Sequence, residues 1–171
     1  MTEKTLYLLR HAEAVSPSAA LDDFDRPLNA GGQRAACGMG AYLAKKGWRP
    51  DCVLCSPARR AVETWEGLRA ALGDLPVRYR KTLYLAPPSQ VKACLHGLPA
   101  RVRSVLVIGH NPGFAHFARR LVKGGKPQAL QRLGGTYAPA SLAVIRFPVP
   151  AWKAIEAGQG DLAAFLRPAD F

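Results

Sequence analysis

The sequence predicts an α/β fold in which helices cover both faces of a doubly wound, mostly parallel β-sheet, a three-layer α/β/α sandwich. Strand-sized apolar stretches alternate along the chain with longer segments of helical periodicity. The stretch VLVIG at residues 105–109 is apolar throughout, as expected of a strand buried on both faces. Two apolar stretches also stop abruptly at a histidine, and an open α/β sheet binds its ligands beyond such strand ends.

The first half of the chain carries two predicted strands and two predicted helices. Asn29 marks the start of a helix whose apolar residues share one face, and Gly47 ends it. Ser56 and Pro57 are expected to be the N-cap and first-turn proline of the next helix. The predicted segments are a strand over 6–9, a polar connection over 16–27, a helix from 29 to about 46, a strand over 51–55 and a helix reaching 72.

The second half continues the alternation and is expected to end with antiparallel strands at the edge of the sheet. The basic, glycine-containing segment 123–135 is interpreted as a mobile loop. No linker, repeat or low-complexity segment is visible, so residues 1–171 are predicted to form one domain. The predicted segments are a strand and its exit over 77–85, a helix over 89–98, a strand over 104–109, a helix over 112–122, a strand over 141–147, a turn at 158–160 and a strand within 162–166.

The chain is strongly basic, because 24 Lys and Arg residues against 12 Asp and Glu give a formal net charge of +12. Such an excess attracts phosphates, nucleic acid or acidic protein surfaces. The basic residues are spread along the chain, without a basic arm or an aromatic-interleaved RNA-binding motif. We therefore interpret the charge mainly as a solvated surface and do not expect nucleic acid as a partner.

The location of the protein is expected to be cytoplasmic. Every apolar stretch is strand-sized, so no membrane span is predicted. The N-terminal MTEKTLYLL lacks the long apolar region and the cleavage site of a secretory signal. In that compartment Cys37, Cys52, Cys55 and Cys94 are expected to stay reduced.

The polar residues that follow the predicted strands favour a phosphate site. Arg10 and His11 follow the first strand, residues 56–60 follow the second, and His110 follows the VLVIG strand. Arg26 reaches the same edge from the connection over 16–27. Arginine's planar fork binds phosphoryl oxygens in bidentate fashion, and two helix N-termini would add amide donors. The sequence thus predicts an anion-binding pocket at this edge of the sheet.

Three motifs in this pocket resemble those of the histidine phosphatase (phosphoglycerate mutase-like) superfamily. They are Arg10-His11-Ala12, the SPxxR segment at 56–60, and Gly109-His110-Asn111-Pro112. The short chain, the Arg26-Pro27-Leu28 segment and the GHNP form are most similar to the SixA-type phosphohistidine phosphatase branch. The resemblance extends from Leu6 to about Phe114 and implies a phosphoglycerate mutase-like fold.

The resemblance implies a role for each motif residue. His11 would attack phosphorus and form a phosphohistidine enzyme, which water then hydrolyses. Its attacking nitrogen must be neutral, with the other ring nitrogen's proton held by a backbone carbonyl. His110 would stabilise charge during transfer, and Asn111 is a candidate phosphate ligand or a helix cap. Arg10, Arg26 and Arg60 would bind the phosphoryl oxygens, so no metal or other cofactor is implied. The SPxxR register selects Arg60 over Arg59, and Arg26 could instead pair with Asp22, Asp23 or Asp25.

One departure from the family pattern bears on the substrate. Many superfamily phosphatases have a carboxylate after the third strand that protonates the leaving oxygen, but residues 82–86 contain none. The loss of a general acid, which contributes roughly 10²–10⁴ in rate, should slow attack on alkyl esters. A protonated imidazole needs no such acid, so the sequence favours protein phosphohistidine as the substrate. Glu13, close to His11, is a candidate substitute acid, and position 12 is Ala where many members have Gly.

Alternative functions follow from the same residues. A small-molecule phosphomonoesterase could use Glu13 or water as its acid, and a non-catalytic phosphate-recognising module could use the arginines alone. A zinc-dependent deaminase is a further alternative, with His11, Cys52 and Cys55 as ligands and Glu13 as proton shuttle. Against it, Asp51 interrupts the motif, and cysteines three apart on a strand point to opposite faces.

Overall fold

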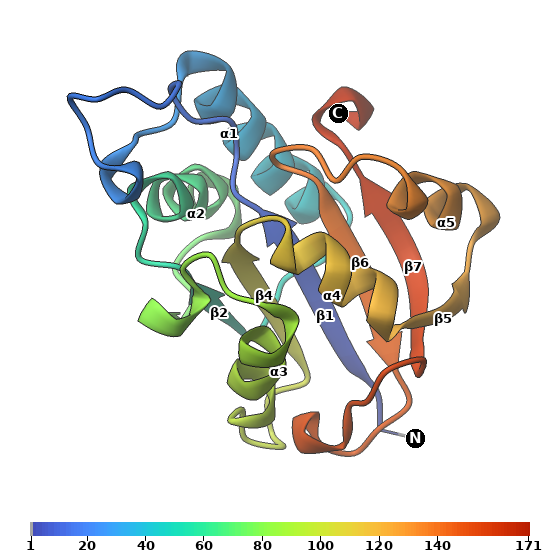
Figure 1. The fold of residues 1–171 in the computed structure, drawn as a ribbon. Coiled ribbons are helices and arrows are strands. Elements are labelled where there is room, and N and C mark those ends of the chain that lie inside the picture. Colours follow the sequence, from blue (N-terminus) through green and yellow to red (C-terminus); the bar gives the residue numbers. More distant parts are fainter. Residues whose placement is uncertain (1) are drawn as a thin grey trace.

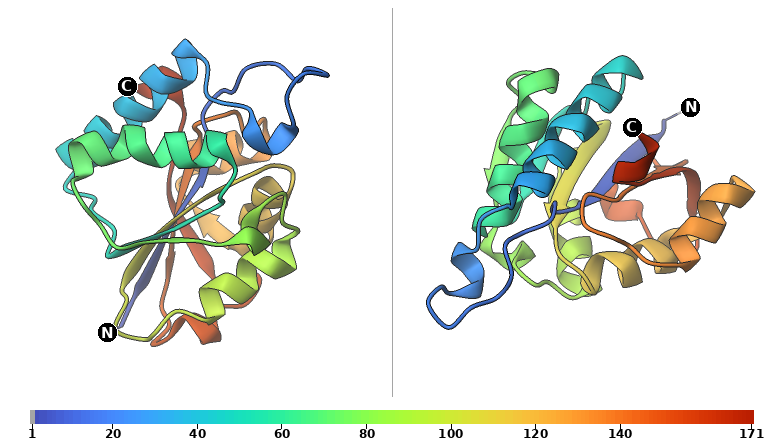
Figure 2. Two further views of the ribbon diagram at one scale, coloured as in Figure 1. Left: turned by 90° about the vertical axis from the view of Figure 1, so that its left-hand side faces the viewer. Right: turned by 90° about the horizontal axis from the view of Figure 1, so that it is seen from above.

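The computed structural model describes residues 2–171 and contains one seven-stranded sheet between two layers of helices (Figures 1 and 2). The strand order is β3-β2-β4-β1-β6-β7-β5. The strands are β1 (Lys4–Arg10), β2 (Cys52–Cys55), β3 (Val77–Tyr79), β4 (Ser104–Gly109), β5 (Val122–Gly125), β6 (Leu142–Phe147) and β7 (Gly160–Leu166). The helices are α1 (Ala30–Lys45), α2 (Arg59–Leu72), α3 (Pro88–His96), α4 (Gly113–Leu121) and α5 (Pro127–Gly134), with 3₁₀ turns η1 (Asp23–Asp25), η2 (Lys81–Leu83), η3 (Trp152–Ala154) and η4 (Pro168–Asp170).

Two apolar cores, one on each face of the sheet, hold the layers together. One core joins α1 and α2 to the sheet through residues such as Met39, Leu43 and Trp65. The other joins α3, α4 and α5 to the opposite face and includes Phe114 and Phe117. Alternate residues of the central strands enter opposite cores, which is why these strands are apolar along their whole length. The predicted three-layer α/β/α class is confirmed.

The antiparallel strand lies inside the sheet rather than at its edge, contrary to the prediction. β6 runs antiparallel to β1 on one side and to β7 on the other. Its burial on both faces fits an interior strand. The edge beyond β7 is taken by β5, which pairs parallel to β7.

The segment 123–135, expected to be a mobile loop, instead contains most of β5 and all of α5. Its glycines suggested a loop, but β5 is held by backbone pairing with β7, which needs no particular side chain. Pro127 opens α5, and Ala129 and Leu133 lie one helical turn apart and are both buried. That spacing of apolar residues was the sequence signal for the helix.

Helix α2 begins later than predicted. Its N-cap is Ala58 and its first residue is Arg59, so Ser56 and Pro57 precede the helix. The start of α1 agrees with the prediction, since the Asn29 side chain accepts a hydrogen bond from the Gly32 amide. No helix within residues 2–171 has both the length and the apolar character needed to cross a lipid bilayer.

The close approach of α1 and α2 depends on glycine. A Cβ atom at Gly40 of α1 would lie 2.7 Å from both the Cα and the carbonyl oxygen of Leu68 in α2. These are backbone atoms in a buried interface, so they cannot move aside without shifting a helix.

We therefore expect Gly40→Ala to lower the free energy of unfolding by about 1–3 kcal/mol, measured by urea denaturation. Gly134→Ala is the matched control, because a Cβ there meets nothing within 4 Å. It should leave stability unchanged or raise it slightly through helix propensity. Equal stability of Gly40→Ala and the wild type would contradict the close packing of α1 on α2.

Candidate active site

The candidate site lies where β1, β2 and β4 end together. The parallel register pairs Arg10 with Gly109 and Cys55 with Ile108, so the three strands stop level with one another. Figure 1 shows β1 and β4 reaching the same edge of the sheet side by side. The His11 amide donates to the Gly109 carbonyl at 2.9 Å, which fixes the chain just past the end of β1. The strand-end residues singled out in the sequence are thus brought to one place.

His11 is 7% exposed and its tautomer is set by the backbone. Its Nδ1 lies 2.6 Å from the Ala12 carbonyl oxygen, which can only accept, so Nδ1 carries the proton. The lone pair is then on Nε2, which receives a hydrogen bond from Arg60 Nε at 3.3 Å. The carbonyl partner expected for a nucleophilic histidine is therefore present.

His110 lies beside His11, with 5.2 Å between the ring centroids. Its Nε2 is 2.7 Å from Ser56 Oγ, so Ser56 contacts the second histidine instead of capping α2. The His110 Nδ1 atom is buried without a hydrogen-bond partner. Such an unpaired buried atom could contact a ligand.

Burial and neighbouring positive charge keep both imidazoles neutral. Burial is the main cause that lowers the pKa of His11 to about 4, and the positive charge of Arg60 lowers it further. Burial also lowers the pKa of His110 to about 3, followed by the proximity of His11 and Arg60. Neutral imidazoles have the lone pairs that nucleophilic attack requires.

Arg10 and Asn111 are held together by one backbone carbonyl. Arg10 Nη1 and Asn111 Nδ2 each donate to the Tyr137 carbonyl oxygen at 2.9 Å. Arg10 Nε and Asn111 Oδ1 are buried and unpaired. Tyr137 is itself fully buried, and its hydroxyl donates to the Leu8 carbonyl in β1. This arrangement fixes both side chains and leaves a guanidinium N–H free for an anion.

Arg60 is 2% exposed, and all three of its nitrogens have partners. Besides Nε on His11, Nη1 donates to the Asp23 carbonyl at 2.6 Å and Nη2 donates to Asp23 Oδ2 at 3.0 Å. Because Nε and Nη2 form one side of the guanidinium, the Asp23 carboxylate occupies half of the fork that would bind a phosphoryl group. Asp23 thus stands in for an anion at Arg60.

Arg26 also binds Asp23, which is one of the three aspartates that the sequence offers as its partner. Its Nε and Nη2 donate to Asp23 Oδ1 at 3.1 and 2.9 Å, and its Nη1 donates to the Val15 carbonyl at 2.6 Å. Tyr84 completes the group, because its hydroxyl donates to Asp23 Oδ2 at 2.5 Å. The hydrogen bond from Tyr84, together with those from Arg26 and Arg60, holds the pKa of Asp23 well below its usual range.

The sequence motifs do not indicate Asp23 or Tyr84 as parts of this site, and they include Ser56 without indicating its contact with His110. Segment 16–27 has the composition of a polar connection, and residues 82–86 contain no carboxylate. Tyr84 lies edge-on to the His110 ring, with centroids 5.4 Å apart, so it lines the pocket all the same. Its position at the exit of the third strand was the available signal.

Glu13 and Arg59 lie to the side of the pocket. Glu13 is exposed, and its Oε2 would be 3.9 Å from a Cβ at Gly31, over the first turn of α1. A helix N-terminus is a favourable place for a carboxylate on its own account. Arg59 pairs with Glu63 at 2.7 Å on the surface, which agrees with the choice of Arg60 as the inward-facing arginine.

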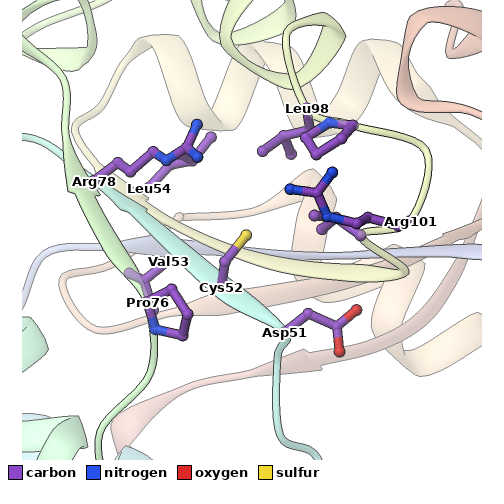
Figure 3. Close-up of a pocket in the computed structure, with 10 residues that line it drawn as sticks. Asp51, Cys52, Val53, Leu54, Pro76, Arg78, Leu98 and Arg101 are labelled. Carbon is purple, nitrogen blue, oxygen red and sulfur yellow. The ribbon is translucent and has the colours of Figure 1, made fainter.

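The arrangement that a zinc deaminase would need is not formed. Cys52 packs against one core and Cys55 lies in the other, on opposite faces of β2. Within residues 2–171, no three His, Cys, Asp or Glu side chains gather as possible metal ligands. Cys52 instead points into a cavity of about 320 Å³, lined also by Arg78 and Arg101 (Figure 3).

Comparisons with known proteins agree with the motifs and the fold. The sequence profile of the Histidine phosphatase superfamily (branch 1) matches residues 6–84. An uncharacterized protein of Mycobacterium tuberculosis is 32% identical over 162 residues, which cover 94% of this chain and 99% of that protein.

Two solved structures described as "putative phosphohistidine phosphatase SixA" share the fold. The one from Agrobacterium tumefaciens has a TM-score of 0.82 and 26% identity, and the match covers 96% of this chain and 98% of that one. The one from Nakamurella multipartitia has a TM-score of 0.79 and 31% identity, covering 98% of both chains. The predicted phosphoglycerate mutase-like fold is thereby confirmed.

The low pKa values of the two histidines predict that acid destabilises the protein. Unfolded histidines bind protons near pH 6.5, whereas folded His11 and His110 do so only near 4 and 3. The unfolded state therefore binds more protons in this interval, and stability falls as the pH drops from 6.5 toward 4. We expect the urea midpoint to decrease over that range, and His110→Asn to weaken the dependence. The same pH dependence in wild type and variant would contradict a buried neutral His110.

Proposed function

The chain belongs to the Histidine phosphatase superfamily (branch 1), and on this premise we propose that it is a phosphatase that removes phosphate from protein phosphohistidine. The observation that carries the proposal is the state of His11, a neutral imidazole with Nδ1 tied to a carbonyl and Nε2 directed at Arg60. A module that only recognises phosphate would need the arginines but not this histidine.

The proposed reaction has two displacements at phosphorus. His11 Nε2 forms a bond to phosphorus while the bond to the substrate's imidazole nitrogen breaks, and that nitrogen keeps the electron pair. Water then attacks the phosphohistidine enzyme, which releases phosphate and regenerates His11. Arg10, Arg60 and Arg26 are proposed to neutralise the phosphoryl oxygens, with Asn111 as a further donor. His110 stabilises charge as the group moves.

The preference for a phosphorus–nitrogen bond is supported by the carboxylates near the pocket. An ester needs a proton on its leaving oxygen, whereas an imidazole already protonated on its other nitrogen leaves neutral. Asp23 is the carboxylate hydrogen-bonded in the pocket, and its depressed pKa means that it holds no proton to give. The description "putative phosphohistidine phosphatase SixA" of two similar structures supports the same substrate class.

Other parts of the proposal follow from the same chemistry. Three arginines provide the positive charge that a metal would otherwise supply, so we propose that turnover is metal-independent. We further propose that the substrate is a phosphorylated protein of the cytoplasm. A small phosphate ester processed with Glu13 or water as the acid remains the competing assignment. The substrate preference of the enzyme separates the two.

We expect the protein to release phosphate from a phosphohistidine protein in the presence of a chelator, and far more slowly from a simple phosphate ester. His11→Ala should reduce release to the uncatalysed background, because the attacking nitrogen is lost. Phosphate release by wild type and variant, run side by side, checks both points. A preference for the ester would assign the site to a general phosphatase, and turnover by His11→Ala would contradict the proposed nucleophile.

A further inference from the structure

Exposed apolar side chains lie on the two chain segments that contribute Asp23 and Tyr84 to the site. Three of the five large apolar side chains exposed within residues 2–171, Leu21, Phe24 and Leu85, lie on the two segments that border it. Phe24 is 38% exposed and Leu85 is 54% exposed. Phe24 is the one of the three that contacts a residue of the site, because its ring packs on Tyr84 and Tyr84 contacts His110.

Aromatic rings line the mouth of the pocket from the histidines outward. The Tyr84 ring is edge-on to His110, and the Phe24 ring is edge-on to Tyr84, with centroids 5.1 Å apart. The Arg60 guanidinium already lies over the Tyr84 ring, 5.9 Å from its centroid, and a further planar, positively charged ring would be attracted to the exposed Phe24 beside it. His11 Nε2 and the Asp23 carboxylate both accept from the Arg60 guanidinium, and Asp23 also accepts from Tyr84, so Arg60 connects the attacking atom to these rings.

Asp23 has a fixed carboxylate in the same mouth. Arg26 occupies Oδ1 with two donors, and Oδ2 accepts from Tyr84 and Arg60. A carboxylate oxygen accepts about two hydrogen bonds, so neither oxygen of Asp23 has acceptor capacity left in the free protein. When a phosphoryl oxygen takes over the Nη2 of Arg60, one place on Oδ2 becomes free, while Arg26 and Tyr84 still hold the carboxylate.

We propose that Asp23, Phe24 and Tyr84 form the leaving-group subsite and select a protonated nitrogen heterocycle, the imidazole of phosphohistidine. The inference rests on the proposed function and adds how the site distinguishes leaving groups. The ring packs on Phe24 and Tyr84, and its N–H donates to the place on Asp23 Oδ2 that Arg60 has vacated. The carboxylate thereby stabilises the cationic ring, which then leaves as neutral imidazole when the phosphorus–nitrogen bond breaks.

The test compares two substrates that differ chiefly in the leaving group, a protein phosphorylated on histidine and the same protein phosphorylated on a serine at that position. In Asp23→Asn, kcat/KM for phosphohistidine should fall roughly 10- to 100-fold, the value of a hydrogen bond to a charged group. Phosphoserine turnover should fall less, because the loss of the charge partner of Arg60 and Arg26 affects both substrates, whereas the loss of the contact to the ring N–H affects only phosphohistidine. Phe24→Leu should likewise lower the ratio of phosphohistidine to phosphoserine turnover. Asp25→Asn, an exposed carboxylate on the same turn, is the control and should leave that ratio unchanged.

Equal losses on the two substrates in Asp23→Asn would overturn the subsite, since they would indicate a general effect on Arg60 or on folding. An unchanged ratio in both Asp23→Asn and Phe24→Leu would overturn it as well. Absence of phosphohistidine turnover by the wild type is a different result, because it removes the proposed function on which the inference rests.

Discussion

The level ends of β1, β2 and β4 are the constraint on which the rest of the site depends. Their parallel register brings three chain segments, each turning from apolar strand to polar loop, to the same edge. The His11 amide is bonded to Gly109 and the Ser56 amide to Ile108, so the loops are held by the backbone of β4. Side chains on these loops then lie within hydrogen-bond distance of one another, as His11 does with Arg60 and His110 with Ser56. A slip of one residue in any strand would direct its side chains to the other face.

A second constraint is the concentration of positive charge at this edge. Arg60 is almost completely buried, and a buried charge needs a partner. In the free protein Asp23 is that partner, and it also holds Arg26 and Tyr84 in place. The same charge, together with burial, keeps His11 and His110 unprotonated. Anion binding and the nucleophilic state of the imidazole therefore have a common electrostatic origin.

The sequence predicts well what depends on local pattern. The apolar strands, the helix start at Asn29 and the strand-end positions of Arg10, His11 and His110 follow from periodicity and motif spacing. The sequence predicts poorly the features that depend on contacts between segments far apart in the chain. Segment 123–135 contains most of β5, which pairs only with β7, and the antiparallel strand β6 is interior because β7 pairs with the side of β6 that faces away from β1. Asp23 and Tyr84 are 61 residues apart, so no local pattern indicates their contact.

The most direct test of the account is to trap the enzyme during turnover. Protein mixed with a phosphohistidine substrate, quenched in alkali and analysed by mass spectrometry, should carry a phosphoryl group on the peptide that contains His11. The modification should be labile to acid, as a phosphorus–nitrogen bond is, and absent from His11→Ala. A wild type that turns over substrate without such an intermediate, or that carries the phosphoryl group on another residue, would contradict His11 as the nucleophile.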